Sequence, residues 1–382
     1  MKMPCAIVTV NHLAARLTRR RVRPALALLA AAILAAGCTR QDTGNAIAKT
    51  DPSEKVLGLP DYRPEQKVAG ILRAWGDNNM GTLMKLWQEG FQKYHPEIRY
   101  ADVLKGNNSA MFGLQEWVAD MAVVGRQIYP NQLFGTLRRS MIYPVEVTVA
   151  TTSFDTPRKA PALVIFVHKD NPLAKLTMKQ LDGIFGVQRT GGWHWLTWHP
   201  EEARGPEGNI RTWGQLGLTG DWANKPIHPY GSPSRGAGAI TFFQTRVLGG
   251  SDLWTDDYRE YVDPREMLEV LAKDPLGIAY AGMCYRNSQV KPLALAKQDG
   301  GPYVEPTRAT VADQTYPLAR HAYIYFTVDQ PNGDPADPRI DPKVKEFLRY
   351  ILSRQGQQDV VREGDYLPLT EDVVRAQLAK LQ

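Results

Sequence analysis

The sequence predicts an α/β protein with two lobes, and three observations support this. Strand, polar turn and helix alternate between residues 67 and 126, as in an open α/β sheet that binds ligands at the carboxyl ends of its strands. The 382 residues have ordinary apolar and charged fractions and are enough for two domains of usual size. A glycine-rich turn runs straight into an apolar helical stretch at Pro229 to Phe243, read PYGSPSRGAGAITFF.

The first lobe is expected to begin at Lys67. Leu83, Leu86, Trp87, Phe91 and Tyr94 recur at helical spacing after the first turn, and Pro96 ends that helix. A second helix is expected after the second turn, through about Val118. The expected strands are Val68 to Trp75, Ile98 to Leu104 and Asp120 to Val124.

Two later apolar strands, Met141 to Thr152 and Ala162 to His168, are candidates for the passage into a second lobe. The apolar run Gly277 to Tyr285 is expected to return the chain to the first. The predicted boundaries are therefore as follows. Residues 67–150 and 277–382 form the first lobe, residues 161–274 form the second, and residues 151–160 and 275–285 connect them.

The amino terminus is typical of an export signal. Residues 1–37 contain a basic segment, an apolar run from Ala25 to Ala36 and small residues before Cys38. The run is too short to span a bilayer. The stretch Leu34 to Cys38 is similar to a bacterial lipobox, which predicts cleavage before Cys38, lipid on its thiol and a periplasmic or cell-surface protein anchored to a membrane. An unmodified cysteine in a cleaved signal is the alternative. Residues 38–66 are polar, without periodicity, and are expected to form a flexible tether.

The net charge and the cysteine content argue against a nucleic-acid-binding protein and against a protein held together by intramolecular disulfides. The formal net charge is +6, and six basic residues without any acidic ones lie within residues 1–37, so the remaining chain is neutral. This removes any argument for nucleic-acid binding. Cys284 is then the single cysteine of the mature chain and is expected to be a buried small hydrophobic residue in a protein without intramolecular disulfides.

Enzyme motifs are missing from the sequence. There is no Gly-x-Ser-x-Gly elbow, His-Glu-x-x-His or phosphate-binding P-loop, and no cofactor is expected. His194 and His199 lie in a tryptophan-rich insert at residues 187–208, but no third ligand has a recognisable spacing, so no metal site is predicted. The insert is expected to pack its tryptophans on the second lobe or on a partner.

The polar turns themselves favour an anion site. Ser232, Ser234 and Arg235 can donate hydrogen bonds, glycines allow close approach of the main chain, and a following helix presents unpaired N–H groups. The alternative is a strand-to-helix turn whose serines and glycines merely cap the helix.

Several motifs, in order along the chain, resemble the phosphate-binding proteins of ABC transporters. Leu176 to Gly186 (LTMKQLDGIFG) and Thr212 to Gly217 (TWGQLG) are similar to one family stretch. Tyr316 to Arg320 (YPLAR), Phe347 to Gly356 and Tyr366 to Leu369 are similar to its carboxyl-terminal signature. The resemblance implies a type II periplasmic solute-binding fold, with two discontinuous lobes joined by two crossing segments that close over an oxyanion.

Carried over by position, the resemblance implies a ligand site made of three helix-leading turns and one strand end. The implied ligand-binding residues are Asp77, Asn78, Asn79, Met80, Asn108, Ser109, Ala110, Arg126, Ser234, Arg235, Gly236, Ala237 and Gly238. Arg126 and Arg235 are expected to clamp the anion unless they pair with carboxylates. Arg235→Ala is expected to weaken anion binding at least tenfold if that residue lies in the cleft.

The last turn departs from the family pattern. The family usually has an arginine near its start and Ser-Gly-Thr at its end, whereas this chain has Ser232-Pro233 and Gly236-Ala237-Gly238. The expected function is still that of a monomeric binding protein that captures phosphate or a related oxyanion and delivers it to an ABC permease. A lipid-anchored scaffold that has lost the ligand is the main alternative, and a phosphoester hydrolase is a lesser one.

Overall fold

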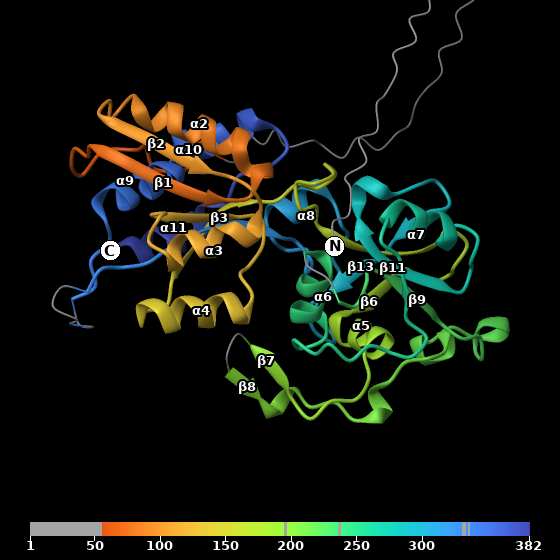
Figure 1. Ribbon diagram of the computed structural model, residues 1–382. Helices are drawn as coiled ribbons and strands as arrows, with labels where there is room; N and C mark the ends of the chain where they lie inside the picture. Colours follow the sequence, from red (N-terminus) through yellow and green to blue (C-terminus); the bar gives the residue numbers. More distant parts are fainter. Residues whose placement is uncertain (1–55, 195–196, 236–237, 331–333, 335–336) are drawn as a thin grey trace, which may run out of the picture. The chain divides into compact units, whose positions relative to one another are not determined.

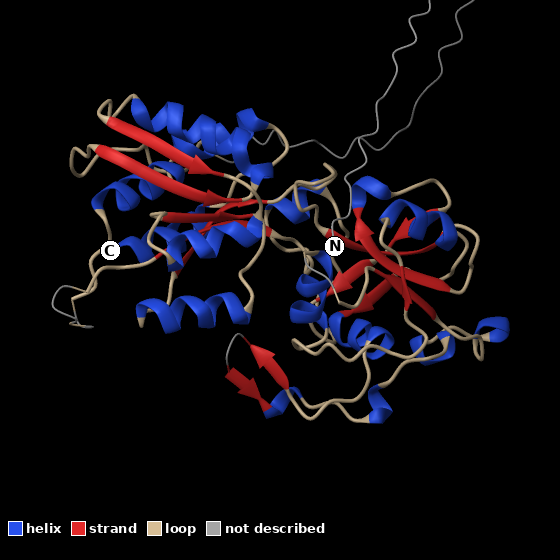
Figure 2. Cartoon of the chain, viewed as in Figure 1, coloured by secondary structure: helices blue, strands red, loops and turns tan. Residues whose placement is uncertain are grey.

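The computed structural model describes residues 56–382, apart from residues 195–196, 236–237, 331–333 and 335–336. Two five-stranded sheets with helices packed against them make up the mixed α/β fold that the sequence predicts (Figure 1). Helices and strands alternate along most of this part of the chain (Figure 2). The signal segment and Cys38 lie outside the described residues.

The first sheet has the strand order β2-β1-β3-β14-β4. The strands β2, β1 and β3 run parallel, and β14 is antiparallel to both of its neighbours. The carboxyl ends of the three parallel strands therefore meet at one edge. The strands are β1 (Gly70–Gly76), β2 (Ile98–Val103), β3 (Met121–Val124), β4 (Val145–Thr151) and β14 (His321–Phe326).

Six helices accompany this sheet, and we call the ensemble the first lobe. Leu83, Met84, Trp87 and Phe91 form the buried face of α2 at the spacing that the sequence shows. The indole N–H of Trp87 donates to the carbonyl oxygen of Gly356 at 2.9 Å, which ties α2 to α10. The helices are α2 (Gly81–Gln92), α3 (Asn107–Gln115), α4 (Pro130–Ser140), α9 (Pro342–Ile351), α10 (Arg354–Glu363) and α11 (Glu371–Leu378).

The second sheet has the strand order β10-β9-β11-β5-β12. Its central strand β11 is parallel to β9 and antiparallel to β5. With its helices it forms the second lobe, which has a hydrophobic core of its own. The strands are β5 (Leu163–His168), β9 (His228–Gly231), β10 (Arg259–Glu260), β11 (Gly277–Gly282) and β12 (Val290–Pro292).

Four helices and two small strand pairs complete the second lobe. Thr177 starts α5 with a capping box, because its hydroxyl accepts from the N–H of Gln180 and the Gln180 side chain accepts from its N–H. The helices are α5 (Met178–Phe185), α6 (Ala239–Val247), α7 (Pro264–Leu271) and α8 (Arg308–Ala312). The strand pairs are β6 (Lys175–Thr177) with β13 (Ala294–Ala296) and β7 (Gly192–His194) with β8 (Thr197–His199).

The predicted return to the first lobe at Gly277 is wrong. Residues 277–282 form the centre of the second sheet, and Val311, Tyr316 and Leu318 still belong to the core of the second lobe. The chain returns only at Arg320, directly before β14. An apolar run identifies a buried strand but does not say which sheet it joins, and this explains the error.

The predicted tether also extends too far. Val56, Leu59 and Tyr62 are buried in the core of the first lobe. The Tyr62 hydroxyl donates to Glu346 at 2.6 Å, and the same carboxylate, fully buried on α9, accepts from the backbone N–H of Glu65 at 3.1 Å. A residue nearly 300 positions away fixes this segment, and no local pattern could have indicated it.

The tryptophan-rich insert contains the hairpin of β7 and β8. Trp193 and Trp198 face each other across it with ring centres 5.2 Å apart, and both remain exposed. The backbone N–H of Trp193 donates to the carbonyl oxygen of Gly249 at 2.8 Å, which attaches the hairpin to the segment after α6. At the base of the insert, Asp182 is buried and pairs with Arg189 and Arg204. The two rings pack on each other rather than into the core of the second lobe.

Candidate functional site

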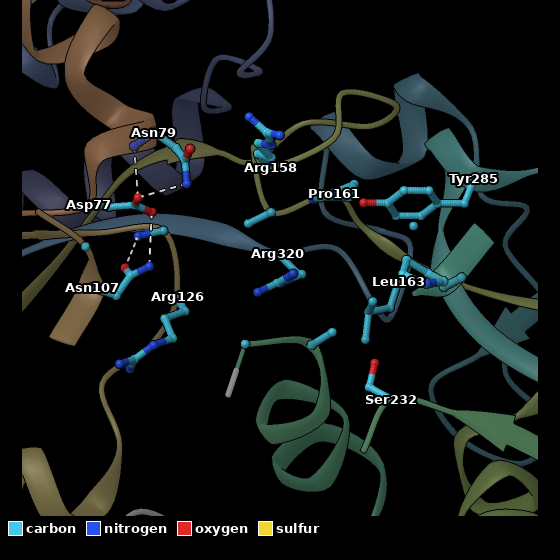
Figure 3. Close-up of a pocket in the computed structure, with 18 of the residues that line it drawn as sticks. Asp77, Asn79, Asn107, Arg126, Arg158, Pro161, Leu163, Ser232, Tyr285 and Arg320 are labelled. Atoms are coloured by element: carbon cyan, nitrogen blue, oxygen red, sulfur yellow. Dashed lines mark hydrogen bonds between the residues drawn. The ribbon is translucent and has the colours of Figure 1, made fainter. Parts of the chain in front are cut away.

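A cavity of about 490 Å³ lies between residues of the two lobes. On one side it is lined by the turns that follow β1, β2 and β3, and on the other by the start of α6 and the end of β11 (Figure 3). The two chain connections, through Arg158 to Pro161 and through Arg320, supply the rest of the wall. This is the edge of the first sheet at which an open α/β fold binds ligands.

Asp77 organises the turn after β1. Its Oδ1 atom accepts hydrogen bonds from the backbone N–H of Asn79 at 2.9 Å and from Nδ2 of the same residue at 3.0 Å. Its Oδ2 atom accepts from Nδ2 of Asn107 at 3.1 Å. The carboxylate thus caps the short helix Asn78–Met80 and joins two of the three turns.

Asn107, the first residue of α3, extends this connection to the third turn. Its Oδ1 atom accepts from the backbone N–H of Gly125 at 2.9 Å. A Cβ atom on Gly125 would lie 2.7 Å from Oδ2 of Asp77, so a side chain at this position would disturb the carboxylate. The close approach of the Asp77 carboxylate explains why glycine stands here.

Arg126 follows in the same turn and is held from several sides. One of its Nη atoms donates to the carbonyl oxygen of Gln127 at 2.8 Å and to Oε1 of Gln132 at 3.0 Å, and the other to Oδ1 of Asn108 at 3.4 Å. The guanidinium stacks 3.6 Å from the ring centre of Tyr129. Burial lowers the pKa of Arg126. The arginine is oriented by protein partners before any ligand arrives.

Arg320 lines the same cavity from the connection into β14, and it differs from Arg126. Figure 3 places it between the first-lobe residues and Leu163 and Ser232 of the second lobe. The residue is only 7% exposed, its Nε atom is buried without a hydrogen-bond partner, and its guanidinium lies 5.3 Å from the ring centre of Phe242. Burial lowers the pKa of Arg320 to about 10, so the side chain stays charged at neutral pH.

The wall formed by the second lobe has fewer polar groups. Ser232, Gly238 and Ala239 line it near the start of α6, and Tyr285 lines it after β11. The backbone N–H of Gly238, next to the first turn of α6, donates to the hydroxyl of Tyr129 at 2.9 Å. Gly238 has φ +83°, a conformation that favours glycine. The main-chain donor expected to face an anion is therefore occupied by a side chain of the first lobe.

The structure brings five of the predicted site residues to this cavity. Asp77, Asn79, Asn108, Arg126 and Gly238 all line it. They come from four separate segments of the chain, and their convergence is the geometric condition that a shared site requires. Contact with a ligand stays a prediction for each of them.

Other predicted residues lie elsewhere. Met80 and Ala110 are fully buried beneath their turns, and the Ser109 hydroxyl donates to the carbonyl oxygen of Gly106 at 2.8 Å. The backbone N–H of Ser234 donates to Glu260 at 3.0 Å, and hydrogen bonding from Ser234 lowers the pKa of that glutamate. Asn78 is exposed and does not line the cavity. Gly236 and Ala237 lie outside the described residues.

Arg235 is exposed and does not line the cavity, so its role as a clamp stays a prediction. The cavity-lining residues that were missed include Lys105, Arg158, Leu163, Tyr285 and Arg320. Arg320 stands within the Tyr316 to Arg320 motif, which gave the only signal in the sequence that pointed to it.

Other kinds of site find little support in the described residues. No group of three or more metal-ligating side chains occurs among them. Burial raises the pKa of Cys284 to about 11, so this half-buried thiol stays protonated at neutral pH. Within the same residues, no helix has the length and apolar character needed to cross a membrane.

Comparisons with known proteins agree with this geometry. A model of the PBP superfamily domain matches residues 62–355. The phosphate-binding protein PstS of Pseudomonas aeruginosa is 32% identical over 362 residues, covering 95% of this chain and 98% of that protein. The protein of the same name from Staphylococcus epidermidis is 24% identical over 223 residues, covering 58% of each chain.

Among solved structures, PstS from Borrelia burgdorferi has the same fold. It superimposes with a TM-score of 0.51 at 16% sequence identity and covers 80% of this chain and 100% of its own. The family match covers most of the chain, and the relative from Pseudomonas aeruginosa covers nearly all of it. The chain therefore belongs to the PBP superfamily, within which it is a relative of the phosphate-binding proteins PstS.

Proposed function

We propose that this protein is an exported solute-binding protein that captures phosphate or a related oxyanion between its lobes and delivers it to an ABC permease. The observation that carries this proposal is the convergence of Asp77, Asn108, Arg126, Arg320 and the start of α6 on one cavity. Helix starts and arginines are the groups that replace the water shell of a small anion. Relatives named as phosphate-binding proteins add the ligand class.

Capture would work by a shift in the population of closed molecules. An anion held by one lobe offers new partners to the other, so closure is favoured by the difference in affinity between closed and open forms. The two connections, residues 152–162 and the segment around Arg320, are where the lobes would pivot. No chemical step is needed for this function, which is consistent with a binding protein rather than an enzyme.

Export and anchoring rest on the sequence of residues 1–38. The basic and apolar segments favour secretion, and the stretch Leu34 to Cys38 favours a lipid on Cys38. Mass spectrometry of the protein recovered from membranes tests this proposal. A tryptic peptide that begins at Cys38 and carries acyl chains is expected, and a soluble product without them would contradict it.

Isothermal titration of the mature protein with phosphate, sulfate and a phosphonate tests the ligand class. Saturable binding of at least one oxyanion without turnover is expected. If the folded protein releases or absorbs no heat of binding with any of these three anions, the proposal is contradicted.

A scaffold that has kept the fold but lost the ligand is the second candidate, because one observation favours it. The hydroxyl of Tyr129 already accepts the hydrogen bond of Gly238 at the start of α6. The last turn also lacks the hydroxyl side chains that the family usually places there. The same titration separates the two candidates, since a scaffold would stay silent.

A further inference from the structure

We propose that Arg320 is the charge-recognition residue of this site and that it selects fully ionised oxyanions over protonated ones. The inference rests on the proposed function and adds a determinant of specificity to it. The guanidinium lies in the connection between the lobes, inside the cavity and next to residues of both (Figure 3). Neither the sequence motif that contains it nor any comparison assigns it a role.

The first argument is that Arg320 forms no direct ion pair with a carboxylate of the described residues. Its guanidinium donates no hydrogen bond to any described residue, its Nε atom is buried without a partner, and Phe242 lies 5.3 Å away. A buried charge without a partner is unfavourable, and the cost falls when an opposite charge arrives. The cavity in front of Arg320 is where that charge would have to bind.

The second argument comes from the neighbouring ionisable groups. The positive charge of Arg126 opposes that of Arg320, whereas the negative charge of Asp77 favours it without pairing with it directly. Both oxygens of the Asp77 carboxylate already accept hydrogen bonds from Asn79 and Asn107. No ion pair between Arg320 and a carboxylate occurs in the part of the chain that the structure describes.

The third argument is the contrast with Arg126. The donors of Arg126 are engaged by Gln127, Gln132 and Asn108. An anion that binds Arg126 can use only the donors that these three hydrogen bonds leave free, whereas none of the Arg320 donors is engaged by a described residue. Arg320 therefore has more interaction free energy to offer a ligand.

These contacts predict what the site prefers. Two arginines favour a dianion, and the Asp77 carboxylate, which could accept a hydrogen bond from a monoanionic phosphate, already accepts three hydrogen bonds from Asn79 and Asn107. Phosphate affinity should rise with pH as the second proton of phosphate is lost near neutrality. Sulfate, a dianion of the same shape without a proton, should compete.

The experiment compares the wild type with Arg320→Met, Arg320→Lys and the matched control Arg138→Met, whose arginine is exposed and does not line the cavity. Phosphate is titrated calorimetrically at about pH 6 and about pH 8, with and without sulfate. Arg320→Met is expected to weaken binding about 10- to 100-fold at the higher pH, as for the loss of a hydrogen-bonded charge. Arg320→Lys should lose less, and Arg138→Met should stay within about twofold of the wild type.

Thermal unfolding without ligand shows whether weaker binding by Arg320→Met comes from a less stable fold. Removing an unpaired buried charge should leave the midpoint of Arg320→Met unchanged or higher, while phosphate should no longer raise it. If Arg320→Met does not fold, Arg320→Gln keeps a neutral side chain of similar length and takes its place.

The outcomes separate the two proposals. A wild type that binds no anion contradicts the proposed function. A wild type that binds phosphate, with an Arg320→Met or Arg320→Gln variant of equal affinity, overturns the role of Arg320. If the wild type binds phosphate equally well at both pH values and sulfate does not compete, the preference for the dianion is overturned.

Discussion

The two walls of the cavity are built in different ways. In the first lobe, Asp77, Asn107 and Gly125 join three turns by direct hydrogen bonds, so the polar groups are oriented before a ligand binds. In the second lobe, glycine and alanine stand where donors were expected, and Gly238 is capped by Tyr129 of the first lobe. We infer that the first lobe and the Arg320 connection determine affinity, while the second lobe mainly encloses the anion.

The largest effect is expected from breaking the first-lobe wall at its centre. Asp77→Ala removes the acceptor of three hydrogen bonds and leaves half-buried donors of Asn79 and Asn107 without this partner, which should lower the free energy of unfolding by on the order of 2 kcal/mol. Anion affinity should fall at least about tenfold with it, because the turns lose their alignment. Urea denaturation and calorimetry measure the two losses.

Asp372→Ala, at a carboxylate that is 91% exposed, is the control and should change neither quantity. Full retention of anion affinity in Asp77→Ala would show that the three turns do not depend on this carboxylate.

A smaller effect is expected from adding one side chain to the same wall. Gly125→Ser adds a small polar side chain whose Cβ would lie 2.7 Å from Oδ2 of Asp77, an atom that already accepts a hydrogen bond from Asn107. Overpacking of this kind costs about 1–3 kcal/mol. We expect reduced stability and weaker binding by the same two measurements.

Gly81→Ala is the matched control for that substitution. A Cβ at Gly81, the first residue of α2, would meet only Leu104 at 3.8 Å. Alanine should be neutral or slightly stabilising in the helix. If Gly125→Ser were as well tolerated as Gly81→Ala, the close fit around Asp77 would not constrain the site.

The smallest effect is expected at the contact between the walls. Tyr129→Phe keeps the ring that stacks on Arg126 but removes the hydroxyl that accepts from Gly238. An anion would then no longer compete with the Tyr129 hydroxyl for the N–H of Gly238. Anion affinity should therefore rise about two- to fivefold, a change no larger than the net contribution of one ordinary hydrogen bond. Calorimetry with Tyr143→Phe, at an exposed tyrosine, as control checks this. A fall in affinity would mean that the hydroxyl helps to bind the ligand.

The sequence predicts the wall of the first lobe better than the rest, for a physical reason. The elements β1, α2, β2, α3 and β3 follow one another, so their turns are set by short-range periodicity and capping. The expected strand Val68 to Trp75 corresponds to β1 at Gly70–Gly76, and the expected helix after it to α2.

Features that depend on long-range contacts could not be predicted in the same way. Tyr62 is ordered by Glu346, β11 joins the second sheet through β5 and β9, and Arg320 reaches the cavity because two lobes meet there. In each case the local pattern fits more than one partner. Gly125 is the clearest example, since the need for glycine follows from Asp77, which lies 48 positions earlier.

The hairpin of the insert places Trp193 where its fluorescence can report movement of the lobes. Trp193 lines a second cavity of about 150 Å³ together with Arg126 of the first lobe and Gly238 of the second. Any displacement of one lobe against the other changes the surroundings of this indole. Its emission should therefore follow ligand capture in real time without an attached dye, and the difference between wild type and Trp193→Phe isolates that signal from the other tryptophans.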